Sequence, residues 1–377
     1  MQTHELKNVL YVGSYIEDYC RNYTFFLTLK QNNINAFKIN LRKSVSKKNK
    51  IIKLLKELRK LKKQKLDLLI FYSLETFSLP FIIARFYAFI KRIPFIHDIF
   101  ISKLQTYYYD RNLSIIKKRI KLKLYYWIYY YLLDFFESHL SNYIFLDTLS
   151  HIKYFHEKFR VPLKKFYKIY IGSRDDIFFP LYQDNKQEGE FIAGFWGTFI
   201  PLQGVQYILK AAKILETYPQ IKFILIGNGL TYSKNKILAR ELRLTNVKFR
   251  GFIPLKNLPS YIKNFDIALG IFGHSSKTLQ VIPNKIFEAN SMKLPVITCE
   301  SPAIKELYHN SENILLCKPA DPKSLSESIL KLKIDFKLRD KIKEKGYITY
   351  QKNASSKVLS KKIVKILNNI ILKNGKD

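Results

Sequence analysis

Short apolar runs alternate with longer amphipathic segments along the whole chain. In the first half, runs rich in β-branched and aromatic residues cover 8–12, 36–39, 67–72, 94–96 and 143–146. The second half repeats this rhythm at 191–196, 222–226, 247–250, 267–269, 296–298 and 313–316. Helix candidates lie between these later runs, at 203–217, 233–242, 258–263 and 283–292. Strands that alternate with helices are typical of a parallel sheet with helices on both faces. The pattern therefore predicts an α/β protein built from two Rossmann-like, doubly wound domains.

The expected joint between these domains is a polar stretch around 172–189 that contains Pro180. The 377 residues exceed one ordinary domain and suit two of roughly 150 to 200 residues each. We predict a first domain over 1–172, a linker over 173–190 and a second domain over 191–350. The remaining segment, 351–377, is expected to form a helix that packs back on the first domain.

The chain carries a net charge of +35, and this charge is spread along its length. Lys and Arg number 33 before Pro180 and 32 after it, against 14 and 16 acidic residues. Three interpretations stay open: attraction to nucleic acid, attraction to an anionic membrane surface, and a coding bias toward residues such as Lys, Ile and Asn. No recognisable nucleic-acid-binding motif accompanies the charge, so nucleic acid is the least favoured partner.

Two segments concentrate basic and apolar residues. Residues 42–65 hold 12 basic residues and one acid, Glu57, with apolar residues at helical spacing. Residues 111–123 are basic and acid-free, and they lead into 125–136, where eight of twelve residues are aromatic. A basic helix with an apolar or aromatic face can lie in a bilayer interface. The same pattern also fits a solvated helix whose apolar stripe joins the core.

The expected location follows from what the sequence lacks. The chain does not begin with a secretory signal pattern, and no uncharged apolar run reaches the ~18 residues of a spanning helix. The nearest run, 77–90, is interrupted by Arg85. Cys20, Cys299 and Cys317 form no close pair, which favours a reducing compartment. We therefore expect a cytoplasmic protein, peripheral at the inner face of a membrane.

Glycine turns follow several of the predicted strands. Gly13 follows the strand at 8–12, and Gly197 follows the strand at 191–196 and leads through Gly204 into a helix. Further glycines end the next two strands, at Gly227 with Gly229, and at Gly251. A turn of this kind places backbone N–H groups at a helix N-terminus, where they can bind phosphate. Several such turns at successive strand ends of one sheet predict a nucleotide crevice.

The segment 281–289 carries the most specific pattern. Pro283 is well suited to start a helix, which places Asn284 and Lys285 in its first turn beside free N–H groups. Glu288 follows one turn later, where its carboxylate can accept hydrogen bonds from a ribose diol. By spacing alone, Glu288 can equally be an ordinary helix residue.

In this order, the motifs resemble family-4 glycosyltransferases of group 1, which have the GT-B fold. The resemblance covers 191 to about 334 and rests on Trp196-Gly197-Thr198, Gln203-Gly204, Gly227-Asn228-Gly229, Gly251-Phe252, the stretch 266–273, and Ile282-Pro283-Asn284-Lys285 with Glu288. The first half is similar more loosely, through 10–15 with Arg21-Asn22, 94–98 with Asp110-Arg111, and a hinge-like set at Gly172, Asp175, Phe178 and Pro180.

The resemblance implies two Rossmann-like domains that face each other across a cleft. It implies a retaining, metal-independent glycosyltransferase that moves a sugar from a nucleotide-sugar donor to a glycan or lipid-linked acceptor in envelope polysaccharide or glycoconjugate synthesis. The nucleotide-sugar is then a co-substrate and no cofactor is needed. The absence of an Asp-x-Asp motif agrees with a site in which helix dipoles and basic side chains stabilise the departing diphosphate.

The resemblance also assigns residues to the site. The expected catalytic residues are Asp98, His97 and Glu288. Donor binding is expected at Gly13, Arg174, Gly197, Thr198, Gln203, Gly204, Gly227, Gly229, Gly251, Phe252, Pro283, Asn284, Lys285 and Glu288. The acceptor side is expected at Arg21, Asp98 and Arg111. His97 can equally be a structural histidine, and Asp110 with Arg111 a surface ion pair.

The chain departs from the family pattern at two places. A second glutamate, eight residues before Glu288, is replaced by Gln280. An Arg and a Lys that many members place beside the donor diphosphate are replaced by Thr198 and Gln203. Lys285, Arg174 and backbone N–H groups would then have to bind the diphosphate. The alternatives are a nucleotide-sugar epimerase or hydrolase of the same fold, a noncatalytic partner subunit, and, remotely, a nucleic-acid binder.

Overall fold

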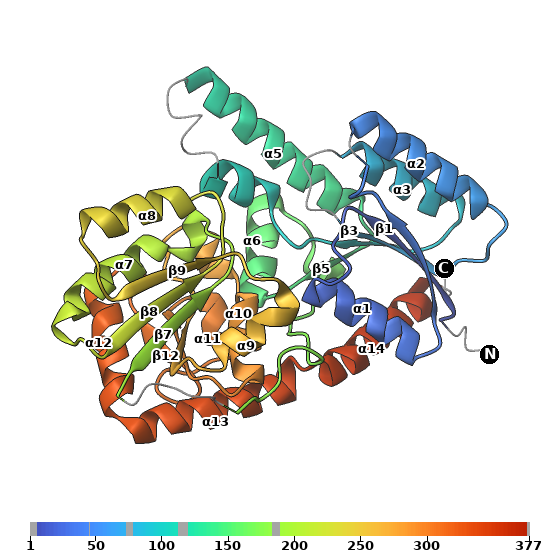
Figure 1. The fold of residues 1–377 in the computed structure, drawn as a ribbon. Helices are drawn as coiled ribbons and strands as arrows, with labels where there is room; N and C mark the ends of the chain where they lie inside the picture. The colour runs from blue at the N-terminus through green and yellow to red at the C-terminus, as the bar shows by residue number, and fades with distance from the viewer. Residues whose placement is uncertain (1–5, 45, 73–77, 112–119, 183–188, 375–377) are drawn as a thin grey trace. The chain divides into compact units, whose positions relative to one another are not determined.

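The computed structural model describes residues 6–44, 46–72, 78–111, 120–182 and 189–374. The chain divides into two compact units, Met1–Ile171 with Lys357–Asp377, and Gly172–Ser356 (Figure 1). The segment 173–190, expected to be a linker, therefore belongs to the second unit, and the chain returns to the first unit at Lys357.

The first unit is built on a six-stranded parallel sheet. Its strands are β1 (Asn8–Gly13), β2 (Asn35–Asn40), β3 (Leu68–Tyr72), β4 (Phe95–Asp98), β5 (Tyr143–Leu146) and β6 (Phe166–Lys168), in the order β2-β1-β3-β4-β5-β6. Between them lie α1 (Cys20–Gln31), α2 (Lys47–Lys60), α3 (Leu79–Ile90), a π-helix η1 (Leu104–Arg111), α5 (Ile120–Leu140), α6 (Leu149–Phe159) and η2 (Leu163–Lys165). Because β1 pairs with both β2 and β3, the strand order reverses between β1 and β3.

The second unit is also built on a six-stranded parallel sheet, with a different strand order. Its strands are β7 (Phe191–Trp196), β8 (Ile221–Ile226), β9 (Val247–Gly251), β10 (Ile267–Leu269), β11 (Val296–Cys299) and β12 (Leu315–Cys317), in the order β12-β11-β10-β7-β8-β9. Its helical segments are η3 (Pro201–Gln203), α7 (Val205–Ile214), η4 (Leu215–Thr217), α8 (Tyr232–Glu241), η5 (Leu255–Asn257), α9 (Leu258–Ile262), η6 (Thr278–Gln280), α10 (Asn284–Ser291), α11 (Pro302–Lys305), α12 (Pro322–Ile334) and α13 (Phe336–Asn353). Here β7 pairs with β8 and β10, so the order reverses between β7 and β10.

The central strands of each sheet are buried because they are apolar on both faces. Every residue of β3 and β7 is buried, as expected for parallel strands covered by helices. The predicted fold class, two doubly wound α/β units of the GT-B type, is confirmed. The pattern missed β6, which has three residues, and η1.

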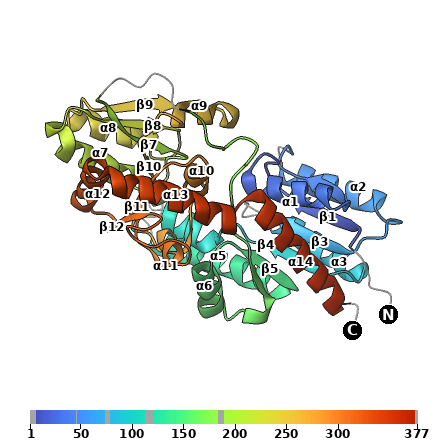
Figure 2. The same ribbon diagram turned by 90° about the horizontal axis from the view of Figure 1, so that it is seen from below.

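The last helix, α14 (Ser356–Asn374), packs into the first unit (Figure 2). Its buried residues recur at helical spacing, at Leu359, Ile363, Leu367 and Ile370, and form one apolar stripe. Asp175 fixes the junction before this helix, since it accepts hydrogen bonds from the Tyr350 hydroxyl and, at 2.7 Å, from the backbone N–H of Ser356.

Candidate functional site

The glycine turns of the second unit are bonded to one another at the carboxyl ends of their strands. The N–H of Gly197 donates to Ile226 O at 3.0 Å, and the N–H of Gly227 donates to Gly251 O at 2.6 Å. Gly227 has φ of +133°, and a Cβ there would lie 1.9 Å from the carbonyl oxygen of Gly197. Only glycine fits this close approach, so the turns after β7, β8 and β9 form one continuous backbone surface.

Lys285 lies where the strand order of this sheet reverses. Its ammonium donates to Gln203 Oε1 at 2.5 Å and to the carbonyl of Gly270 at 3.3 Å, just beyond β10. Nζ also lies 3.6 Å from the ring centroid of Phe195 and 3.3 Å from where a Cβ on Gly197 would be. In open α/β sheets, ligands bind in the crevice at such a switch point. The predicted donor residues Gly197, Gln203 and Lys285 are thus brought together.

Burial sets the charge state of Lys285. Loss of solvent lowers the pKa of its ammonium well below the usual range, and the nearby Glu288 only partly opposes this shift. A buried amine of this kind is easily protonated when an anion arrives, because the anion replaces the lost hydration. The site therefore offers an amine that becomes a cation when a diphosphate binds.

Glu288 projects from α10 and is held by an indole. Trp196, the last residue of β7, donates from Nε1 to Glu288 Oε2 at 2.6 Å. Burial raises the pKa of Glu288, while Trp196 and then Lys285 oppose the rise. Among the described residues, no hydrogen bond reaches its other oxygen, Oε1. This oxygen can accept from a ligand hydroxyl.

The remaining donor-side predictions fall at the rim of the same sheet or on its neighbouring segments. Thr198 and Phe252 are exposed, and Gly204 is the N-cap of α7. Pro283 is the N-cap of α10 and leaves Asn284 and Lys285 in the first turn, as predicted. Arg174 makes a bidentate pair with Asp176, at 2.8 and 2.6 Å.

In the first unit, Asp98 and Arg21 form a buried ion pair. Asp98 ends β4, and both its oxygens accept from Arg21 Nε, at 2.8 and 2.9 Å. Arg21 also donates to Ile169 O at 2.8 Å. The side chains of Asp98 and Arg21 are only 0% and 1% exposed. Burial raises the pKa of Asp98 although Arg21 lowers it. The two predicted acceptor-side residues are brought together, and in this structure they satisfy each other.

Gly13 marks the switch point of the first sheet. It ends β1 with φ of +148°, and a Cβ there would lie 1.8 Å from the carbonyl oxygen of Tyr72 at the end of β3. The position requires glycine because two strand ends approach each other here. Arg111 ends η1, and its side chain lies outside the described residues.

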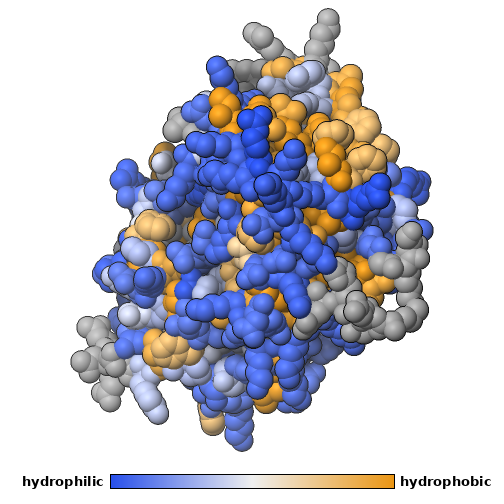
Figure 3. All heavy atoms as spheres, turned by 90° about the vertical axis from the view of Figure 1, so that its right-hand side faces the viewer, coloured by the Kyte–Doolittle hydropathy of each residue, from blue (hydrophilic) through white to orange (hydrophobic). Residues whose placement is uncertain are grey.

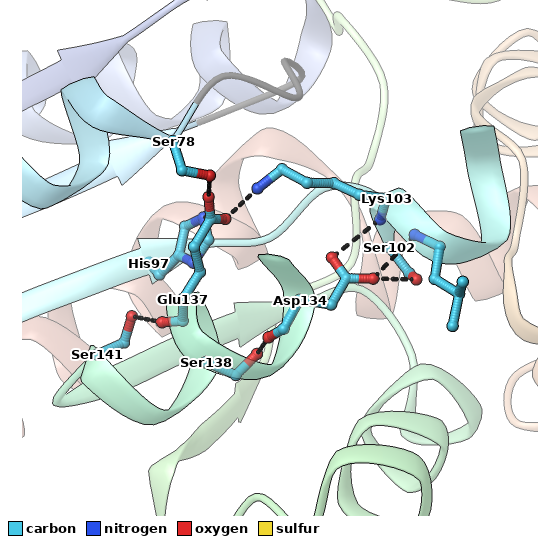
Figure 4. A network of polar contacts seen from close by, with 9 residues as sticks. Ser78, His97, Ser102, Lys103, Asp134, Glu137, Ser138 and Ser141 are labelled. Carbon is cyan, nitrogen blue, oxygen red and sulfur yellow. Dashed lines mark hydrogen bonds and ion pairs between the residues drawn. The ribbon is translucent and has the colours of Figure 1, made fainter. Parts of the chain in front are cut away.

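His97 belongs to a buried network that the sequence analysis did not find (Figure 4). Its Nε2 lies 3.8 Å from Glu137 Oε2, and Glu137 also accepts from Lys103 and Ser78. Burial, and then Lys103, lowers the pKa of His97 well below its usual value, so the imidazole is neutral. Its Nδ1 has no hydrogen-bond partner among the described residues.

Asp134 fixes the start of η1 within the same network. It accepts from the Ser102 hydroxyl at 2.6 Å and from the N–H groups of Lys103 and Leu104 at 3.0 Å each. Burial raises its pKa to about 6 despite these bonds. Asp134 and Glu137 are the only acids of the described helix α5. Two isolated acids in an aromatic segment are a sequence signal from which the buried network could have been predicted.

Comparison with known proteins identifies part of the chain. Residues 181–349 match the family model described as "Glycosyl transferases group 1". The second unit is a group 1 glycosyl transferase domain. The recognition of a group 1 glycosyltransferase from the motifs of this segment is thereby confirmed, and the finer assignment to family 4 stays a prediction. No curated protein matches the chain.

Solved structures resemble both units of the chain. HepE of Anabaena, in complex with UDP and glucose, is 15% identical with a TM-score of 0.66, over 96% of this chain and 99% of that one. Sucrose-phosphate synthase of Thermosynechococcus elongatus is 12% identical with a TM-score of 0.72, over 98% and 100%. A glycosyltransferase of Rickettsia africae is 14% identical with a TM-score of 0.64, over 98% and 99%. At these identities the likeness shows the fold.

Proposed function

We propose that the protein is a retaining glycosyltransferase that transfers a sugar from a nucleotide-sugar to a glycan or lipid-linked acceptor without a metal ion. The observation that carries the proposal is the buried ammonium of Lys285 at the switch point of a group 1 domain. The complexes of HepE with UDP and glucose support a nucleotide-sugar as the donor class.

The candidate site residues of the second unit have the following proposed roles in this reaction. Lys285 and the N–H groups of the glycine turns would bind the diphosphate and stabilise its charge as the sugar leaves. Glu288, oriented by Trp196, would accept from hydroxyl groups of the ribose or sugar through Oε1. Gln203 supplies no charge itself, but it holds the ammonium of Lys285 near the Gly197 turn.

The first unit would bind the acceptor. In the proposal Asp98 and Arg21 act as a pair that shapes the carboxyl end of β4, and His97 provides a neutral ring at the same strand end. The structure has no group of three or more His, Cys, Asp or Glu suited to a metal ion among the residues it describes.

The proposal also includes a cytoplasmic location, a role in envelope polysaccharide or glycoconjugate synthesis, and peripheral contact with a membrane.

The test uses slow transfer to water, which needs no knowledge of the acceptor. UDP-glucose and other nucleotide-sugars are incubated with the full chain, and the first sugar released is identified by proton NMR before it mutarotates. The proposal predicts release with the anomeric configuration of the donor, at an equal rate with and without a chelator, and a large loss in Glu288→Gln.

Three results would contradict the proposal. Release with the opposite configuration excludes retention, and loss of activity with a chelator excludes metal independence. Binding of donors without release of sugar or transfer to any glycan or lipid acceptor favours a noncatalytic partner subunit.

A further inference from the structure

The outward face of two helices in the first unit is apolar where a solvated face is normally polar. Helix α3 buries Phe81, Ala84 and Ala88 against the sheet, so its other side faces away from the core. That other side carries Phe86, Phe89 and Ile90, which are 61%, 67% and 62% exposed. A helix that is apolar all round normally lies within a core or a membrane.

Helix α2 extends this surface beside α3. Leu54 and Leu58 of α2 join the same core cluster as α3, so the apolar stripe noticed in 42–65 is largely core. Ile52 and Leu55 lie on the opposite side and are exposed. We call Ile52, Leu55, Ile82, Phe86, Phe89 and Ile90 the α2–α3 face. Figure 3 shows apolar side chains gathered on the upper part of one side of the molecule, next to hydrophilic ones.

Hydrogen bonds hold the two helices together at their C-terminal ends. Lys91, just after α3, donates to the carbonyls of Lys62 and Gln64 beyond α2, at 2.5 and 3.2 Å. The Tyr87 hydroxyl donates to Leu61 O at 3.2 Å. On its other side, Arg85 Nε donates to Leu140 O, the end of α5, at 2.6 Å.

The rim of this face is positive. Lys48, Lys56 and Arg59 share the exposed side of α2 with Ile52 and Leu55, because their spacing of three and four residues is helical. Lys62, Lys63, Lys91 and Arg92 surround the joined ends of the two helices. The one acid of α2, Glu57, is already paired with Lys60 at 2.8 Å.

We propose that the α2–α3 face docks on an anionic lipid bilayer, with its Phe and Ile side chains in the headgroup boundary and its Lys and Arg side chains on lipid phosphates. A bilayer interface accepts an apolar helix face of this kind and attracts a basic rim. A second copy of the chain fits less well, because a symmetric contact would bring like charges together. None of the described helices is long and apolar enough to cross a membrane.

This surface coincides only in part with the two segments singled out from the sequence, because α2 lies within 42–65 whereas α3 lies in neither segment. The aromatic segment 125–136 places many of its rings against one another and against α6 and η1, through pairs such as Tyr131 with Phe159 and Tyr107 with Tyr130. Residues 112–119 lie outside the described residues. The inference uses no residue of the proposed donor site and stands whether or not the protein transfers sugar.

The test is flotation of the full chain with vesicles of phosphatidylcholine, alone or with about one third phosphatidylglycerol. We expect binding to the anionic vesicles, at least tenfold weaker in the double variant Phe86→Ser, Phe89→Ser and in Lys48→Glu, Lys56→Glu. The matched controls in the second unit are Ile334→Ser with Phe336→Ser, and Lys331→Glu with Lys337→Glu, which change the same numbers of exposed apolar and basic residues. These controls should bind as the unchanged chain does.

Three outcomes would overturn the inference. They are absence of vesicle binding by the unchanged chain, equal loss in the control variants, and a dimer in sedimentation that only the α3 variant dissociates. Equal melting temperatures of variants and unchanged chain confirm that they are folded. Vesicle binding without donor hydrolysis would leave this inference intact while it contradicts the proposed function.

Discussion

At the scale of single residues, the second unit places one buried ammonium, that of Lys285, where the ends of β7 and β10 meet. Replacement of Lys285 by Met keeps the length of the side chain and removes its charge. We expect affinity for a nucleoside diphosphate to fall by about tenfold to a hundredfold, the cost of one charged hydrogen bond. Affinity for the nucleoside alone should not change.

Calorimetric titration with both ligands measures this difference. The matched control is Lys293→Met, which removes a half-exposed ammonium paired with Glu344 in the same unit. Equal affinities of the Lys285 variant and the unchanged chain for the diphosphate would show that the phosphates bind elsewhere. Loss of affinity for the nucleoside as well would point to misfolding.

Proton uptake follows from the lowered pKa of Lys285. In the free protein the amine is neutral above its lowered pKa, whereas in the unfolded chain it is protonated up to its ordinary pKa. A bound diphosphate raises the pKa again, so binding takes up a proton and affinity falls as the pH rises through the pKa of the free site. Titrations in two buffers of different ionisation enthalpy measure this uptake, which Lys285→Met should abolish.

The pair of Arg21 and Asp98 lends itself to a stability test. Asp98→Asn leaves the buried guanidinium with a neutral partner, and we expect a loss of about 3–5 kcal/mol in the free energy of unfolding. Urea unfolding measures this loss, with Asp340→Asn, which breaks an exposed pair with Lys343, as the control. A near-zero effect of Asp98→Asn would show that the pair is dispensable to the fold.

Sequence patterns predicted the place of the candidate donor residues on their helix, but not their partners. Lys285 and Glu288 lie in the first two turns of α10, as predicted, because Pro283 precedes its first residue. The indole of Trp196, 92 positions away from Glu288, has no local signal as its partner. The pairing of Lys103 with Glu137 was missed for the same reason, since buried charges pair through the tertiary fold.

At the scale of elements, the junction between α13 and α14 depends on Asp175. Asp175→Ala removes an acceptor that both the buried Tyr350 hydroxyl and the N–H of Ser356 use. We expect a loss of about 1–3 kcal/mol in the free energy of unfolding. Amide exchange around Ser356 should quicken. Unchanged exchange there would mean that helix packing alone holds the junction.

Elements were predicted where their periodicity was clear. The long strands were found because buried parallel strands are continuous apolar runs. Three-residue β6 has no such run, and η1 departs from the α-helical period. The exposed face of α3 was not recognised, because an apolar residue in a sequence carries no mark of which side of a helix the core covers.

At the scale of the whole molecule, the chain forms two units that are each built on a six-stranded parallel sheet but differ in strand order, and the chain returns to the first unit in α14. The tandem repeat was predictable because each half alternates strands and helices, and parallel connections leave few topologies. The net charge of +35 did not decide between nucleic acid, a membrane surface and a coding bias, since composition alone does not show where charge gathers on the surface. The structure places part of it around the α2–α3 face.

The most direct measurement of the central claim is a thermal-shift screen of the full chain against UDP, GDP, ADP and CMP. A ligand that binds only the folded state at a hundredfold excess over its Kd stabilises it by about 2.7 kcal/mol. The account predicts a clear rise in melting temperature with one of these nucleotides, lost in Glu288→Gln and in Lys285→Met but kept in Lys293→Met. A rise that survives both substitutions, or no rise with any nucleotide, would contradict the assignment of the donor site.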